Sequence, residues 1–587
     1  VRARYRNGAG GDGVLPDDQV RALLVTRAGQ VWVGTMNGVA TYQEAGDSFL
    51  TWRYDAGDAG SPAGNRIASF FEDRDGLIWI GTWTGGFSIH NPATQAVRLI
   101  RNHGRDRTSL PASPVRALWM DADGSLWMGV MEGGGLVHYD LEQGVLQRWV
   151  HDPNDPASLS GNVVQGIART PDGQLWIGTQ GAGLARMRAD GSGFDHFRRE
   201  DQRPGSLPDN VIQALYIDRS GSLWIGFESA GLARWISDES GFRVYSRDLA
   251  SPTGLQAGSV YAFAETADGS FWVGTWGAGL ALFDRATGQF THFRERPGDL
   301  TSISHNSVTT IVEGRDGVLW IGTQGGGLNR VTRGADGKLT FAAIGKREGL
   351  GAEAIGTLIE DASGRLWIGT TVGVDSYDPT TAEVQSFSAS DGMDKSGYFV
   401  GSMARGNDGA IYLGGLRGVL AFHPERLPRR GRIPRVVFTD LRIDNADPGL
   451  QAAAKGRIGP PRAIHSLDQL NLPSGISSVA IDYSALDFAN PDGLRYSYRL
   501  DGFDRDWIEG RTLSRTAAYT NLAAGEYTLR VRARDGEGGD YGPESSLRLS
   551  VAPEPWRSPA ALLAYALALI LAATAVGVGA RRRWERE

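Results

Sequence analysis

Four polar or aromatic side chains share one repeated position in the sequence, directly after a Gly-Thr pair or its equivalent. They are Gln180, Glu228, Trp276 and Gln324. A Trp ring stacks on sugar rings, and Gln and Glu form hydrogen bonds with hydroxyl groups, so this mixture favours binding of a small molecule or an oligosaccharide. The alternative is that the residues at this position only seal a central channel. In the other five repeats this position is occupied by Met36, Trp83, Met131, Thr371 and Leu416.

Residues for catalysis or metal binding form no recognisable pattern. The 587 residues include 9 His and no Cys, which excludes thiol catalysis, disulfides and thiolate metal sites. His196 and His292 occupy equivalent places in a repeat, and the glycine-rich run from Gly322 lacks the Lys-Ser/Thr ending of a phosphate loop. We therefore expect no catalytic residue, no metal and no cofactor in this region.

The four residues belong to a repeat that organises the first part of the chain. A phrase such as GQLWIGT, from Gly173, recurs nine times at intervals of 45 to 49 residues. Each unit contains four short runs of alternating apolar residues with Asp-Gly or Ser-Gly turns, which predicts a four-stranded β-propeller blade. We expect the aromatic residue of the phrase to fill the core between neighbouring blades. These residues are Trp32, Trp79, Trp127, Trp176, Trp224, Trp272, Trp320, Trp367 and Tyr412.

The repeated phrase D-x-x-G-x-L-W-I-G-T, followed by G-G-L, resembles the bacterial two-component regulator propeller family over about the first 425 residues. The resemblance implies the sensor part of a membrane receptor. It also implies a cytoplasmic output domain beyond Glu587, with a histidine kinase favoured and a diguanylate cyclase next.

Nine repeats exceed the roughly four to eight blades of most propeller rings. We favour a seven-bladed ring at residues 105–425, preceded at residues 1–104 by blades of a truncated upstream propeller; the family often carries two seven-bladed rings. The segment VRARYRN at residues 1–7 resembles the outer strand of a blade, so a second hypothesis is that it closes a ring with the last blade. A continuous arc of nine units is the third.

A different all-β domain is expected after the repeats. Short alternating strands over residues 433–553 predict an immunoglobulin-like β-sandwich. The segment from Leu494 onward resembles the three-tyrosine domain that follows such propellers, and its motif residues are Tyr498, Tyr519 and Tyr527. We expect these tyrosines to be packing and hydrogen-bonding anchors rather than ligand contacts.

A single membrane span is expected at residues 559–580. Residues 560–580 carry no charge and span about 31 Å as a helix, enough for the roughly 30 Å core of a bilayer. The following Arg581, Arg582 and Arg583 place residues 581–587 in the cytoplasm and residues 1–558 in the periplasm, with the helix in the bacterial inner membrane. A buried soluble helix and a C-terminal sorting tail are the alternatives.

The sequence is compatible with three classes of function. The first is a ligand sensor that relays binding through the sandwich and the helix to a response regulator, as an expected homodimer. The second is a tethered extracellular enzyme such as a polysaccharide lyase or hydrolase; a glycoside hydrolase needs two carboxylates, and Glu228 is the only one at the varied position. The third is a tethered adhesion module. A net charge of -7 argues against a nucleic-acid partner.

Overall fold

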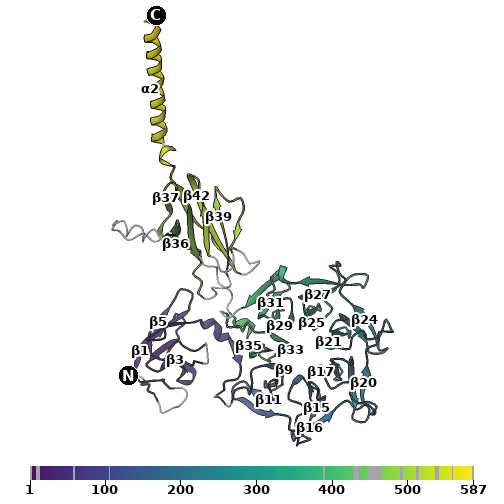
Figure 1. The fold of residues 1–587 in the computed structure, drawn as a ribbon. Coiled ribbons are helices and arrows are strands. Elements are labelled where there is room, and N and C mark those ends of the chain that lie inside the picture. Colours follow the sequence, from purple (N-terminus) through teal and green to yellow (C-terminus); the bar gives the residue numbers. More distant parts are fainter. Residues whose placement is uncertain are drawn as a thin grey trace. The chain divides into compact units, whose positions relative to one another are not determined.

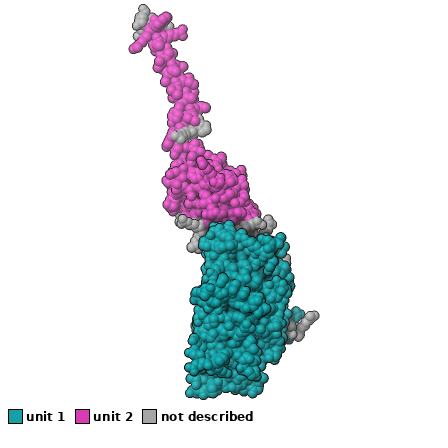
Figure 2. All heavy atoms as spheres, turned by 90° about the vertical axis from the view of Figure 1, so that its right-hand side faces the viewer, with its two compact units in different colours: residues 1–429 teal, residues 430–587 magenta. Residues whose placement is uncertain are grey.

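The chain folds into two compact units, residues 1–429 and 430–587 (Figure 2). The computed structural model describes residues 3–7, 14–56, 60–104, 106, 108–387, 391–427, 435–446, 464–488, 494–510, 515–535, 541–557 and 559–584. In these ranges the strands are joined by turns and by short 3-10 helices. The short helices are η1 (Glu44–Gly46), η2 (Pro92–Ala96), η3 (Lys346–Glu348), η5 (Pro424–Arg426), η6 (Ile464–Ser466) and η7 (Pro555–Arg557).

Seven four-stranded antiparallel sheets form a ring in the described part of the first unit, with inner strands such as β9, β17, β21 and β33 around its centre (Figure 1). The inner strands are β9 (Val115–Met120), β13 (Val164–Arg169), β17 (Ile212–Ile217), β21 (Val260–Glu265), β25 (Val308–Glu313), β29 (Ile355–Glu360) and β33 (Tyr398–Arg405). The second strands are β10 (Leu126–Val130), β14 (Leu175–Thr179), β18 (Leu223–Phe227), β22 (Phe271–Thr275), β26 (Leu319–Thr323), β30 (Leu366–Thr370) and β34 (Ile411–Gly415). The third strands are β11 (Gly135–Asp140), β15 (Leu184–Met187), β19 (Leu232–Ser237), β23 (Leu280–Asp284), β27 (Leu328–Arg333), β31 (Val374–Asp378) and β35 (Gly418–Phe422). The outer strands are β12 (Gly144–Trp149), β16 (Phe194–Phe197), β20 (Gly241–Tyr245), β24 (Gln289–Phe293), β28 (Leu339–Ile344), β32 (Glu383–Phe387) and β8 (Val97–Ile100).

The ring is closed by a strand from its N-terminal side. Neighbouring inner strands contact one another all the way round, including β33 with β9. The last sheet has no outer strand of its own and takes β8, which pairs antiparallel with β35 through Val97–Phe422 and Ile100–Val419. The seven-bladed propeller expected from the repeat is thus confirmed. The boundary expected at 104/105 differs, because β8 lies before it and pairs inside the ring; residue 105 is outside the described residues.

The aromatic residue of each ring repeat packs on the next sheet. Trp127, for example, lies in one cluster with Ile167, Leu175 and Ile177 of the sheet β13–β16. Tyr412 of the last sheet joins Leu118 and the closing-strand residue Ile100. All seven ring aromatics are buried, at 5% exposure or less. Apolar burial stabilises at about 25 cal/mol per Å2, so these interfaces contribute to the ring's stability.

Three of the six ring Trp indoles, those of Trp127, Trp224 and Trp367, are also anchored by the Asp that opens the repeated phrase. Trp224 Nε1 donates to Asp218 Oδ2 at 2.8 Å, and Trp367 Nε1 donates to Asp361 Oδ2 at the same distance. Where the repeat has Thr in place of Asp, the indole lacks this acceptor. Among the described residues, the buried Nε1 atoms of Trp176 and Trp272 have no hydrogen-bond partner.

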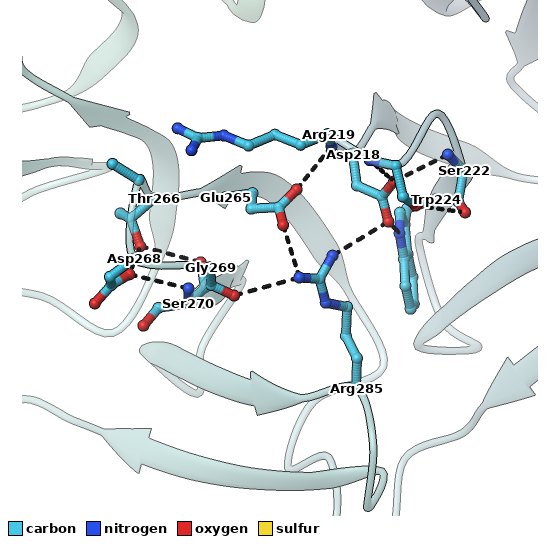
Figure 3. A network of polar contacts seen from close by, with 12 residues as sticks. Asp218, Arg219, Ser222, Trp224, Glu265, Thr266, Asp268, Gly269, Ser270 and Arg285 are labelled. Atoms are coloured by element: carbon cyan, nitrogen blue, oxygen red, sulfur yellow. Dashed lines mark hydrogen bonds and ion pairs between the residues drawn. The ribbon is translucent and has the colours of Figure 1, made fainter.

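A charged network extends the Asp218 anchor to the neighbouring blade (Figure 3). Arg285 contacts Asp218 at 3.3 Å and Glu265 at 2.6 Å, so one guanidinium joins two carboxylates. Glu265 also accepts a hydrogen bond from the backbone N of Arg219 in the preceding blade at 2.7 Å. Burial opposes ionisation of Asp218, but hydrogen bonds from Ser220, Trp224 and Ser222 hold its pKa below the usual value.

Two further sheets lie N-terminal to the ring. One consists of β1 (Val20–Val25), β2 (Val31–Thr35), β3 (Gly38–Gln43) and β4 (Ser48–Trp52), and the other of β5 (Ile67–Glu72), β6 (Ile78–Thr82) and β7 (Phe87–His90). Trp32 is buried between them, whereas Trp79 is only half-buried. The two outward faces expose large apolar side chains. These are Leu23, Val25 and Leu50 on the first sheet and Phe71, Phe87 and Ile89 on the second.

The described residues of the VRARYRN segment, 3–7, adopt no strand, but one of them packs as an outer-strand aromatic does. The Tyr5 ring lies 5.2 Å from Phe49 on the outer strand β4 and 5.8 Å from Tyr42 on the third strand β3. Inside the ring, Phe197 of one outer strand packs in the same way on Phe242 of the next blade. The ring-closing role considered for this segment is taken by β8 instead.

The second unit contains a β-sandwich with an apolar core. Its sheets are β36–β38–β41 and β37–β43–β42–β39–β40. The strands are β36 (Val437–Ile443), β37 (Gln469–Leu472), β38 (Ser478–Ser484), β39 (Leu494–Asp501), β40 (Ile508–Glu509), β41 (Thr516–Thr520), β42 (Gly525–Asp535) and β43 (Ser545–Val551). Residue 433, where this domain was expected to begin, lies outside the described residues.

The three motif tyrosines contact the sandwich itself. Tyr519 is buried and its hydroxyl donates to Asp504 at 2.6 Å, while Tyr498 packs edge-on against it at 6.3 Å. Burial and Asp504 raise the pKa of both phenols. The Tyr527 hydroxyl donates to the Ala523 carbonyl at 3.0 Å. These contacts are of the kind expected of anchors, and the role of the three tyrosines stays a prediction.

The C-terminal helix α2 (Pro559–Trp584) is long and apolar enough to cross a membrane once. Its central residues are not buried by any described part of the chain, and Leu569, Leu571 and Val576 are exposed. Arg581, Arg582 and Arg583 lie in its last turn, and residues 585–587 are outside the described range.

We expect Ile100→Ala to destabilise the ring by about 2–5 kcal/mol, because Ile100 is 4% exposed in the closing interface. Urea unfolding of the full chain, followed by Trp fluorescence, measures the loss. Ile89→Ala is the matched control, since Ile89 is exposed on β7 and its truncation should cost under about 1 kcal/mol. Equal effects of the two changes would contradict the closing role of β8.

We expect Asp218→Asn to lower stability by about 1–3 kcal/mol at pH 7, because it removes the charge from hydrogen bonds to Trp224 and Arg285. The folded pKa of Asp218 is depressed, so its charge contributes stability above about pH 4, and that contribution is lost as pH falls through the folded pKa. Melting temperatures measured from pH 7 to pH 3 should therefore converge for the two proteins. The exposed-site change Asp172→Asn is the control and should alter stability at pH 7 by less than about 0.5 kcal/mol.

Candidate functional site: the rim of the propeller channel

The loops between second and third strands lie on the same face of the ring as the loops between blades; we call this the rim face. Backbone hydrogen bonds show the proximity. Trp276 N donates to Ser259 O at 3.1 Å, and Gln180 N donates to Val163 O at 2.9 Å. In each case the partner immediately precedes the inner strand of the same blade, so the side chains expected to vary at this face do lie on it.

The next blade holds these loops in place. Gly277 N and Gly279 N, on either side of the turn after Trp276, both donate to the carbonyl of Asn306, at 3.0 and 2.7 Å. Gly181 N and Gly183 N, which follow Gln180, bond in the same way to Asn210. Fixed loops offer side chains to a ligand without a large ordering cost.

A β-bulge at the start of each inner strand supplies a second row of residues at this face. In β17 the pairing skips from Ile212 to Ala214, which leaves Gln213 opposite no residue of β18. The same shift occurs in the sheets of β9, β13, β21, β25 and β29. The bulged residues are Arg116, Gln165, Gln213, Tyr261, Thr309 and Gly356.

Glu228 connects the two rows. Its Oε2 accepts hydrogen bonds from Gln213 Nε2 in the same blade and from the Tyr261 hydroxyl of the next blade, the latter at 3.1 Å. The Trp276 ring lies 5.1 Å from the Tyr261 ring and is 41% exposed. Burial, followed by the charge of Glu228, raises the pKa of Tyr261 to about 12, so this phenol remains a neutral donor.

The central channel contains a cavity of about 170 Å3 beneath these residues. Its upper layer is polar and includes Gln165, Gln213, Tyr261 and Thr309, whereas deeper positions such as Leu215 are apolar. Gln165 and Thr309 are 9% and 1% exposed. Among the described residues, Gln165 Oε1 and Thr309 Oγ1 have no hydrogen-bond partner. Buried polar atoms without partners are costly unless water or a ligand satisfies them.

The last inner strand, β33, carries a larger bulge where it lines the channel. Between the pairs Tyr398–Gly415 and Met403–Leu413, β33 has four residues where β34 has one. Val400 and Gly401 in this bulge line the cavity. Gly401 has a φ of 71°, a left-handed conformation that side-chain-bearing residues rarely adopt.

Arg116 fixes this bulge to the first blade of the ring. Its Nη1 donates to the Val400 carbonyl at 2.6 Å, and its guanidinium lies 5.7 Å from the centre of the Phe399 ring. Arg116 is 9% exposed, and burial lowers its pKa to about 10. In the described part of the chain no carboxylate forms an ion pair with it. It is therefore a buried cation whose charge is not balanced by a neighbouring acid.

The structure brings together two of the four side chains singled out from sequence. Glu228 and Trp276 meet through Tyr261, whereas no hydrogen bond joins Gln180 or Gln324 to them within the described ranges. Gln180 and Glu228 are exposed and Gln324 is half-buried. Whether any of the four contacts a ligand stays a prediction. No group of three or more His, Asp or Glu placed to hold a metal occurs among the described residues.

Sequence reasoning missed the bulged row. The signal was present, because the repeats vary at the second residue of each inner strand while its neighbours stay small or aliphatic, as in VVQGI and SVYAF. The bulge itself turns that varied residue toward the channel, and it depends on pairing with the second strand, which the local alternation does not reveal.

Comparison with known families agrees with this architecture. Segments of the chain match two family models, described as two component regulator propeller and Y_Y_Y domain. The repeats match at residues 14–37, 61–84, 158–181, 206–229, 254–277, 302–325 and 349–371, and the Y_Y_Y domain matches at residues 487–552.

Two individual proteins illustrate the similarity. The extracellular domain of the hybrid two component system BT3049 from B. thetaiotaomicron has a similar fold, with a TM-score of 0.72 and 21% identity over 92% of this chain and 74% of that one. Histidine kinase P4 of Formosa agariphila is 29% identical over 200 residues. That match covers 34% of this chain and 14% of the relative, so the aligned segment spans only a small part of that protein's length.

We expect Gln165→Met to leave the free energy of unfolding unchanged or to raise it by up to about 1 kcal/mol, because the change removes a buried acceptor that lacks a partner. Gln213→Met should lower it by about 0.5–1.5 kcal/mol, because Glu228 loses a donor. Urea titration of both variants measures the difference. A large loss in Gln165→Met would mean that bound water or another group already satisfies its oxygen.

Proposed function

We propose that this chain is the extracytoplasmic ligand-sensing region of a membrane-bound two-component receptor. The rim face of the ring binds a small molecule or an oligosaccharide. The sandwich and α2 relay binding to a cytoplasmic output domain, with a histidine kinase favoured over a diguanylate cyclase, and from there to a response regulator. The protein acts as a homodimer in this proposal.

The observation that carries the proposal is the helix α2. It presents an apolar surface that no described residue buries, which is costly in water and stable in a bilayer. Three arginines at its C-terminal end favour a cytoplasmic position for that end, because positive residues remain on the cytoplasmic side. Residues 1–558 then lie in the periplasm of a bacterium with the helix in its inner membrane.

We further propose that the two N-terminal sheets belong to a second propeller. In the ring, both faces of every sheet are covered by neighbours, whereas the outward faces of these two sheets expose residues such as Leu23 and Phe71. Tyr5 packs on the first sheet as outer-strand aromatics of a preceding blade do. Further blades on both sides would bury these faces.

The rim face is the proposed ligand surface because it combines an exposed Trp with polar groups on fixed loops. Trp276 supplies a flat apolar surface, and Glu228 supplies a carboxylate that accepts hydroxyl donors. Ligand binding shifts the receptor only if it favours one of two states, so the relay requires contacts that differ between them.

We expect the full chain, joined after Glu587 to a histidine kinase core and expressed in a bacterial inner membrane, to change its kinase output several-fold with a ligand in the medium. A panel of neutral and acidic oligosaccharides and their monosaccharides is the probe, and a response-regulator reporter gives the readout. Trp276→Ala should remove the response because it removes the stacking surface. Trp83→Ala is the matched control, since Trp83 is exposed at the same repeat position outside the ring.

Topology is checked in the same cells. The chain has no Cys, so one introduced thiol is its only label site. A membrane-impermeant maleimide should label Ser192→Cys in spheroplasts, and a Cys added after Glu587 only after lysis. The receptor proposal would be overturned if the maleimide labelled both Cys variants in spheroplasts. It would also be overturned if no sugar of the panel changed the response-regulator reporter. A response lost in Trp83→Ala but kept in Trp276→Ala would move the ligand face away from the ring.

A further inference from the structure

The channel beneath the rim contains groups that accept hydroxyl donors, and a buried cation is bonded to one of the residues that line it. Arg116 carries the positive charge, and Gln165 Oε1 and Thr309 Oγ1 are buried without partners among the described residues. Gln165 and Thr309 line the cavity, and Val400, which accepts from Arg116, lines it too. These features come from four different inner strands, so only the closed ring assembles them.

We propose that the channel mouth binds the carboxylate of a hydroxylated acid, such as a uronic acid or the acidic end of an oligosaccharide, with Arg116 as its cation. The inference rests on the proposed function, because it names the ligand chemistry for the same face. Arg116 donates to the carboxylate, and hydroxyl groups of the ligand donate to Gln165, Thr309 and Glu228.

The charges favour a singly charged group. A buried guanidinium without a carboxylate partner has lost much of its hydration, and a bound anion restores favourable interactions. Its Nη1 is held by Val400, which fixes the direction of the guanidinium, and a guanidinium has five N–H donors in all. Glu228 stands at the same mouth and repels a dianion such as phosphate, while it accepts hydroxyl donors readily.

The size of the cavity fits this role. A volume of about 170 Å3 holds roughly six water molecules at ~30 Å3 each, or the carboxylate and adjoining carbons of a larger molecule. The remainder of such a ligand would extend past Tyr261 to the exposed face of Trp276, where a sugar ring can stack. Water alone is the competing occupant.

The test is isothermal titration of the full chain in nanodiscs with D-galacturonate and D-glucuronate, against D-galactose, D-glucose and acetate. At least one uronate should bind at least tenfold more tightly than its neutral sugar and than acetate, which lacks the hydroxyl groups. Arg116→Gln should weaken uronate binding at least tenfold and abolish the preference over the neutral sugar. The matched control is Arg21→Gln, because Arg21 occupies the equivalent bulge of β1 but is exposed there.

Gln165→Met keeps the test decisive if Arg116→Gln fails to fold. It should weaken uronate binding about threefold or more while stability stays equal or rises, a combination that a purely structural role would not give. The proposal is overturned if uronate binds no more tightly than the neutral sugar. It is also overturned if the folded variants bind uronate as tightly as the unchanged chain, and the channel then holds water alone.

The two proposals fail separately. Arg116-dependent uronate binding without any change in kinase output would leave the channel site standing and overturn the receptor role. A kinase response to a neutral sugar, with no uronate binding, would support the receptor role and overturn the channel site.

Discussion

The packing of one aromatic side chain against the next sheet is the constraint on which the rest of the first unit depends. Trp127 is buried only because the following sheet covers it, and each ring sheet stands in the same relation to its neighbour. A row of such sheets leaves an apolar face uncovered at each end unless the row closes into a ring. Tyr412 and Ile100 pack together where the last sheet meets the first. Where closure is lacking, Trp79 is half-buried and Phe71 is exposed to solvent. Ring geometry thus follows from the need to cover apolar faces.

The same repetition confines chemical variety to a small part of the surface. Core positions are committed to packing, and turn positions such as Asp218 are committed to anchoring the indoles. The residues left free to vary are the one after each second strand and the one bulged from each inner strand, and both rows meet around the channel on the rim face. Glu228 and Tyr261 connect the rows and join two blades. A rigid scaffold with a varied rim is well suited to holding a ligand in a defined orientation.

The sequence predicted the elements whose signals are local. Strand alternation, turn residues and the spacing of the aromatics led to the blades, the sandwich and the apolar helix, and they placed Glu228 and Trp276 on one face. The partner of β8 was not predictable in this way, because its hydrogen bonds cross more than three hundred residues and its sequence resembles every other outer strand. Arg116 was missed for a related reason. Arg116 is notable because it is buried against the Val400 bulge. The residues next to Arg116 in the sequence predict neither its burial nor that bulge.

The pairing of β8 with β35 also has a mechanical consequence. The chain enters β8 at Val97 and leaves β35 at Phe422, and these two residues are paired with each other. Tension applied between the two ends of the ring would therefore peel the strands apart from that pair, one hydrogen bond at a time, rather than shear all of them together. The buried cores between the sheets stabilise the ring against heat and denaturant. The β8–β35 pair, in contrast, separates under low force when tension is applied between the two ends of the ring.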